Sequence, residues 1–162
     1  METIAPYMYY RDLIIFTQRG NYRGRISNAK PIFVIALIDA IERKIFVDNR
    51  LLWGNSEFEA IYYKHSEHYH NRTRIILPFF HLDTSEYFHV KWRQKYHGLN
   101  HMPSIRFMID NVEYAFLDNA LWDILQDRET RELLKNEIIR FFKLYNPQNE
   151  ALRFSRTKRS LL

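Results

Sequence analysis

The chain has 162 residues, no Cys, and 24 Lys and Arg against 19 Asp and Glu, which gives a net charge of +5. Apolar residues make up 46% of the sequence and glycine and proline are sparse, which excludes a disordered or low-complexity protein. The lack of Cys excludes a disulfide framework and a thiolate metal site, and the basic excess suits a polyanionic partner. We therefore expect one compact cytoplasmic domain.

The first half of the sequence predicts three helices. Residues 7–18 form the first, and the glycines and asparagine of residues 20–24 indicate a loop after it. A proline opens residues 31–44, a second helix that is apolar on nearly every side and therefore expected to be buried. The Ser-x-x-Glu sequence at the start of residues 56–68 has the spacing of a capping box and predicts a third helix.

The middle of the sequence predicts a small β-hairpin. Residues 74–80 are expected to be extended around a proline, and residues 80–82 and 87–92 are expected to be strands. The polar residues 83–86 would join these strands as a turn. Residues 104–115 leave strand and loop open as alternatives.

Two helices are predicted near the end of the chain. Asp118 is placed as the N-cap of a short helix, and Asp127 as the start of a longer one that ends at Asn146 and Pro147. The prediction is an α+β fold, a single helix-dominated domain with a small β-hairpin over residues 1–146. Residues 147–162 form a basic C-terminal tail, which we interpret as a soluble end.

Several short motifs occur in a specific order. A proline-started apolar segment is followed by Leu-Pro-Phe-Phe-His-Leu, an aromatic strand, and two further matching segments: residues 28–42, 77–82, 86–92, 112–125 and 131–134. Together, over about residues 12–145, they resemble the sulfur-binding domain of type IV-like, modification-dependent restriction endonucleases. That domain lies N-terminal to an HNH nuclease and reads phosphorothioate-modified DNA.

The resemblance implies a pocket for the sulfur atom. Pro78, Phe80 and His81 match the turn that meets the modified linkage, and Tyr114 and Ala115 are the best candidates for the other side. A sulfur atom is larger, softer and less strongly hydrated than the oxygen it replaces, so an apolar cup beside a positive group can distinguish the two. The alternative is that the phenylalanines of this turn belong to the core and that His81 is a surface donor.

A basic loop precedes the second predicted helix. Arg23, Arg25 and Lys30 are candidates for phosphate binding, and Tyr22 for stacking on a sugar or base. The Lys-Pro pair at residues 30–31 matches the same pair in the family. The alternative is a solvated loop.

Catalytic residues are not predicted. The sequence lacks a complete HNH site, a Ser/His/Asp arrangement, a glycine-rich phosphate loop and a Rossmann fingerprint. His65, Glu67, His68 and His70 offer metal-binding residue types, but their spacing favours a solvated face, and no cofactor is expected.

The sequence therefore predicts a non-catalytic DNA-binding module of a prokaryotic restriction or defence system. Its partners would be phosphorothioate-modified double-stranded DNA and a nuclease domain or subunit. Two alternatives stay open: a small metal-dependent nuclease built around the histidines, and a protein-interaction subunit of a defence complex.

Overall fold

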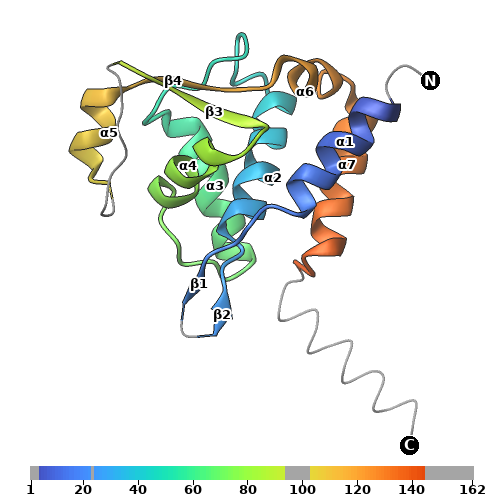
Figure 1. Cartoon of the computed structure of the whole chain (residues 1–162), viewed down its shortest axis with the longest axis horizontal. Coiled ribbons are helices and arrows are strands. Elements are labelled where there is room, and N and C mark those ends of the chain that lie inside the picture. Colours follow the sequence, from blue (N-terminus) through green and yellow to red (C-terminus); the bar gives the residue numbers. More distant parts are fainter. Residues whose placement is uncertain (1–3, 23, 94–102, 145–162) are drawn as a thin grey trace, which may run out of the picture.

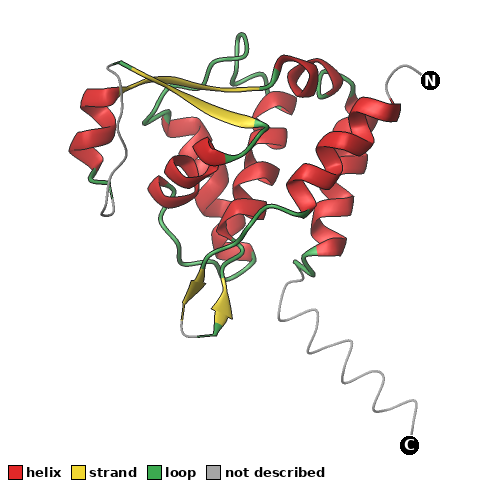
Figure 2. Ribbon diagram, viewed as in Figure 1, coloured by secondary structure: helices red, strands yellow, loops and turns green. Residues whose placement is uncertain are grey.

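The structure is a computed structural model that describes residues 4–22, 24–93 and 103–144 (Figure 1). In chain order its elements are α1 (Ile4–Ile15), β1 (Asn21–Tyr22), β2 (Arg25–Ile26), α2 (Ala29–Glu42), α3 (Ser56–His68), α4 (Ile76–His81), the 3₁₀ turn η1 (Leu82–Thr84), β3 (Phe88–Trp92), α5 (Ile105–Asn111), β4 (Val112–Leu117), α6 (Asn119–Ile124) and α7 (Arg128–Phe141). The fold is α+β and dominated by helices, as predicted (Figure 2). Arg23, the predicted boundary at residue 146 and the basic tail lie outside the described residues.

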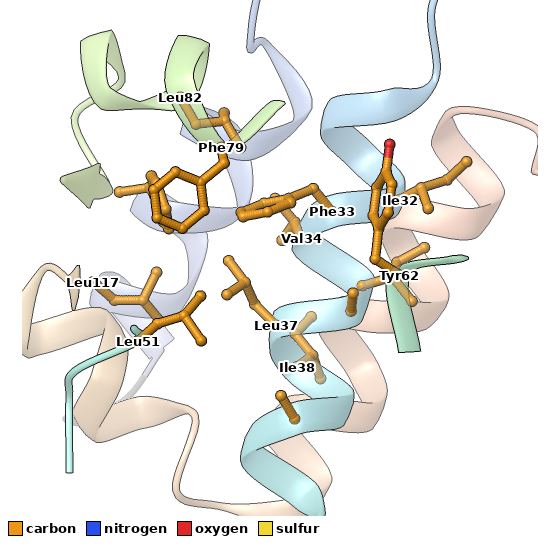
Figure 3. Close-up of a cluster of buried hydrophobic side chains, with 14 of the residues drawn as sticks. Ile32, Phe33, Val34, Leu37, Ile38, Leu51, Tyr62, Phe79, Leu82 and Leu117 are labelled. Carbon is orange, nitrogen blue, oxygen red and sulfur yellow. The ribbon is translucent and has the colours of Figure 1, made fainter. Parts of the chain in front are cut away.

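Helix α2 is the centre of the fold, with α3 packed on one side and α7 on the other (Figure 1). Eleven of its fourteen residues are buried, which confirms the interpretation of an apolar central helix. Phe33 packs edge-on against Phe58 and Phe88 with ring centroids 5.3 Å apart, and Phe79 lies beside it in the same cluster (Figure 3). Burial of a phenylalanine of this kind contributes about 2 kcal/mol.

The segment around Pro78 differs from the prediction. It forms α4 and η1, where an extended segment and a strand were expected, so both of those predictions were wrong. Pro78 occupies the first turn of α4, where a backbone N–H would have no helical partner and its loss costs little. Phe79 of α4 and Leu82 of η1 are buried almost completely, and this tertiary packing decides the conformation.

Strand β3 pairs with β4, and not with residues 80–82. The antiparallel register joins Val90 to Ala115, and both face the core. The ambiguous residues 104–115 thus contain both a helix, α5, and the start of a strand. Asp83, predicted in a simple turn, accepts hydrogen bonds from the Val90 backbone N–H (2.7 Å) and the Trp92 ring (3.1 Å), and so protects the free edge of β3.

The loop predicted at residues 20–24 contains a small hairpin. Strands β1 and β2 pair antiparallel, and Gly24 has a φ of +80° in the turn between them. Only glycine adopts that conformation without strain. The hairpin projects from the end of the molecule where α2 begins (Figure 1).

The predicted boundaries of the first three helices agree with the structure in part. α1 begins at Ile4 and ends at Ile15, three residues earlier than predicted at each end, and α2 begins at Ala29, two residues before the proline. The cap of α3 is Asn55, whose side chain accepts from Phe58 N at 2.9 Å, so the predicted Ser56 capping box was wrong.

Two aspartates begin the last helices. Asp127 caps α7 by accepting from Thr130 N at 2.9 Å, as predicted, although α7 ends at Phe141 and not at residue 146. Asp118 occupies the N-cap position of α6 but makes no capping hydrogen bond. Its carboxylate instead binds the Tyr10 hydroxyl at 3.0 Å and His89 at 2.5 Å, which ties α1 to β3.

None of the helices among the described residues is sufficiently long and apolar to cross a membrane.

Candidate nucleic-acid interface

Three chain segments meet at the end of the molecule that carries the β1–β2 hairpin. The Ser27 and Thr73 hydroxyl groups lie 3.4 Å apart, which joins the base of the hairpin to the loop after α3. The Arg19 guanidinium donates to the Asn28 side chain at 2.9 Å, which joins the segment after α1 to the start of α2. These contacts gather five basic side chains, which we call the basic end: Arg19, Arg25, Lys30, Arg72 and Arg74.

The basic end carries uncompensated charge. Among residues 4–22, 24–93 and 103–144, none of its five side chains forms an ion pair. Cations between α2 and α7 are paired instead, for example Arg131 with Glu42 and Lys135 with Asp39. A group of unpaired cations on one surface attracts polyanions and orients their approach.

Lys30 borders a hollow of about 250 Å³, which we call the Lys30 hollow. Its ammonium group donates to the backbone carbonyl of Gln18 at 2.6 Å, and burial lowers its pKa. The walls come from α1 and the segment that follows it, from α4 and η1, and from the turn before β3: Leu13, Thr17, Gln18, His81, Leu82, Thr84, Ser85, Glu86 and Tyr87. A cation thus lies beside apolar and hydroxyl-bearing side chains.

His81 faces Lys30 across this hollow. Burial, and then the charge of Lys30, lower the pKa of His81. The charged forms of both side chains are therefore disfavoured in the free protein, and an anion placed between them would favour both. Glu86 also lines the hollow and accepts a hydrogen bond from Tyr9 at 3.1 Å, so the rim on that side is acidic.

The structure brings together only part of the predicted sulfur pocket. Pro78, Phe80 and His81 lie on α4, with Pro78 buried and Phe80 half-buried. The Phe80 ring lies 5.3 Å from the His81 ring and 6.0 Å from the ring of Trp92. Of the three, His81 lines the Lys30 hollow.

Tyr114 and Ala115 lie elsewhere. Ala115 is fully buried on the core side of β4, and Tyr114 points to the opposite face of the sheet. The Tyr114 ring lies 4.9 Å from the Arg50 guanidinium and 5.3 Å from the Lys91 ammonium. It borders a separate hollow of about 400 Å³, which shares no residue with the Lys30 hollow. The structure thus does not join these two residues to His81.

Neither a protein-family model nor a curated protein matches this chain.

The phosphate-binding candidates are placed in part. Lys30 and Arg25 belong to the basic end, with Arg25 exposed on the hairpin. Arg23 and the side chain of Tyr22 lie outside the described part of the chain.

The sequence analysis missed Arg72 and Arg74, which the structure adds to the basic end. The Arg-Thr-Arg triplet after α3 is a visible signal of a basic turn. Its position beside the hairpin depends on a contact between residues 46 positions apart in the chain, Ser27 and Thr73, which the local sequence does not indicate.

The histidine cluster of the alternative nuclease hypothesis does not assemble. His65 binds Asp39 at 2.5 Å, and the ring of His68 packs edge-on against Tyr69 at 4.6 Å. His70 follows the end of α3 with a φ of +55°. Within the described residues, no group of three His, Cys, Asp or Glu side chains could hold a metal ion.

Proposed function

We propose that this chain is a non-catalytic DNA-binding module that reads phosphorothioate-modified duplex DNA in a prokaryotic restriction or defence system. The observation that carries DNA binding is the basic end, where three contacting segments carry five basic side chains that form no ion pair with any described residue. The resemblance of residues 28–42 and 77–92 to the sulfur-binding domain supports the choice of mark. A nuclease domain or subunit in the same cytoplasm would perform the cleavage.

The Lys30 hollow supports a role in reading the modified linkage. A phosphorothioate keeps the negative charge of a phosphate, which Lys30 and a protonated His81 would both attract. Its sulfur atom needs less hydration than an oxygen, and the half-buried Leu13 offers apolar surface beside the cation. Moving the modified linkage from water into this hollow would therefore cost less hydration free energy than moving the plain linkage.

The direct test is a fluorescence-polarisation titration with one duplex, with and without a single stereodefined phosphorothioate. We expect at least about tenfold tighter binding of the modified duplex, which corresponds to about 1.4 kcal/mol. Lys30→Ala should weaken the binding of both duplexes, because Lys30 would attract the negative charge that the plain and the modified linkage both carry. Arg43→Ala is the matched control, since Arg43 is exposed at the other end of α2.

Three outcomes would overturn parts of this proposal. Equal binding of both duplexes would leave a DNA-binding module without sulfur recognition. Absence of binding at low salt would reject the DNA-binding function itself. Cleavage of plasmid DNA by the purified chain on addition of Mg²⁺ or Mn²⁺ would reject the non-catalytic assignment and support the alternative of a metal-dependent nuclease.

A further inference from the structure

Two exposed phenylalanines meet where α1 and α7 end. Phe16, directly after α1, is 78% exposed, and Phe141, the last residue of α7, is 51% exposed. Their ring centroids lie 6.4 Å apart at an interplanar angle of 71°. The two helices lie side by side and run toward the same end of the molecule (Figure 1). We call this pair of rings the Phe16–Phe141 platform.

The platform is continuous with the basic end. Phe141 packs edge-on against the buried Phe142 at 5.2 Å, and the Arg19 guanidinium lies over the Phe142 ring at 4.7 Å. Arg19 also binds Asn28 at the base of the hairpin. A single chain of contacts therefore links the exposed rings to the proposed phosphate-binding surface.

The charge around the platform is positive. Arg140 and Lys143 are exposed beside Phe141, and neither forms an ion pair within the described residues. The acids one helical turn before the two rings, Asp12 and Glu137, both lie near Arg11, at 3.1 and 3.8 Å. The platform thus combines aromatic faces with cations that have no acidic partner in the described part of the chain, and proteins hold unpaired nucleotides with this combination of aromatic and basic side chains.

We infer that the Phe16–Phe141 platform stacks unpaired bases of a strand that extends from the duplex bound at the basic end. Aromatic rings stack on every base, so this contact is tolerant of sequence, and Arg140 and Lys143 would hold the adjacent phosphates. The strand is DNA or RNA, which share bases and phosphates. This inference rests on the proposed duplex binding and adds a contact to it, because the platform uses none of the residues of the Lys30 hollow.

The test compares a blunt duplex with the same duplex carrying a six-nucleotide single-stranded overhang of DNA or of RNA. Wild-type protein should bind the overhang duplexes about fivefold or more tightly than the blunt one. Phe16→Ala and Phe141→Ala should remove this preference and leave blunt-duplex binding unchanged. Leu133→Ala is the control, because Leu133 is a similarly exposed apolar residue of α7, at 49% exposure. Circular dichroism confirms that each variant is folded.

The outcomes separate this inference from the proposed function. Equal binding of blunt and overhang duplexes by wild type, or a preference that survives both phenylalanine substitutions, overturns the platform but not duplex binding. Binding of a single-stranded oligonucleotide without any binding of duplex would reject the proposed function and overturn the extension of the strand from a bound duplex. A concentration-dependent dimer that Phe141→Ala dissociates, with no overhang preference, would show that the platform is a contact between two copies of the chain and overturn the inference.

Discussion

Lys30 and His81 share one hollow, in which burial, and then the positive charge of Lys30, lower the pKa of His81. The neutral form of His81 is therefore favoured in the free protein. Burial also lowers the pKa of Lys30. An anion in the hollow interacts favourably with the charged form of each side chain, so its binding is coupled to protonation.

This coupling predicts that duplex binding strengthens as the pH falls. A bound phosphate raises the pKa of His81 from its lowered value, so the complex takes up a proton. We expect affinity at constant salt to rise between about pH 7.5 and about pH 5.5. His81→Gln should flatten this dependence, whereas His68→Gln, at an exposed histidine outside the hollow, should not. A pH profile that is the same for wild type and His81→Gln would contradict the coupling.

From the basic end we expect duplex affinity to fall with rising salt concentration, with a slope set by the number of phosphate contacts. Each phosphate contact that is removed should lower the slope of log K against log [salt] by about 0.9. Arg72→Ala and Arg74→Ala should each reduce duplex affinity and this slope, since both side chains are exposed and unpaired within the described residues. Lys64→Ala, on an exposed part of α3, is the control. If the slope of both arginine variants equals that of wild type, these residues do not contact phosphate.

The sequence predicted the elements whose structure depends on local signals. The apolar residues of α2, the cap of α7 at Asp127 and the extent of α3 were all readable from spacing and residue type. The conformation of α4 was not, because Pro78 suits a strand edge as well as a first helical turn. What decides it is the contact of Phe79 with Phe33 and Trp53, which are distant in the sequence.

The candidate site, too, could be predicted only where the signal is local in the sequence. Lys30 and the basic loop were visible as a local motif, and Lys30 does lie beside His81. Tyr114 was assigned to the same pocket, but strand alternation in β4 places it on the outer face, because Ala115 takes the core position opposite Val90. The partner strand determines that alternation, and the sequence analysis had paired β3 with the wrong segment.

From the contacts of Asp39 we expect the stability of the fold to depend on pH. Its carboxylate accepts from His65 at 2.5 Å and from Lys135 at 2.8 Å, which joins α2 to α3 and α7. Burial alone would raise the pKa of Asp39, but the hydrogen bonds and charges of His65 and Lys135 bring it below its ordinary value. A carboxylate with a lowered pKa stabilises the fold above its unfolded pKa and loses that contribution as the pH falls through the folded value.

Asp39→Asn should therefore lower the free energy of unfolding at pH 7 by about 2 kcal/mol, as expected for two charged hydrogen bonds in a partly buried site. The difference from wild type should shrink as the pH falls below about 4, because this carboxyl takes up a proton in the unfolded chain before it does so in the fold. Urea denaturation of both proteins at pH 7 and at about pH 3 measures this difference in the free energy of unfolding. Asp110→Asn is the control, because its ion pair with Arg106 is exposed. A difference that stays constant down to about pH 3 would contradict the linkage.

Phe80 and Tyr114, the two aromatic residues of the sulfur pocket predicted from the sequence, should respond differently to substitution. Phe80 packs against the His81 ring, and so helps to position a side chain of the Lys30 hollow. Phe80→Leu should therefore reduce the preference for the phosphorothioate duplex more than it reduces binding of the plain duplex. Tyr114→Leu should leave the preference unchanged, because Tyr114 packs against Arg50 and Lys91 on the outer face of the sheet.

The two variants are informative as a pair, since both replace a half-buried aromatic residue by leucine. Polarisation titrations with modified and plain duplexes give the preference, and thermal unfolding shows whether each variant retains the fold. Loss of preference in Tyr114→Leu alone would move the sulfur site to the outer face of β3 and β4, beside Arg50. Equal loss of modified and plain binding in Phe80→Leu, with the fold intact, would show that Phe80 supports the phosphate contact and not the choice between sulfur and oxygen.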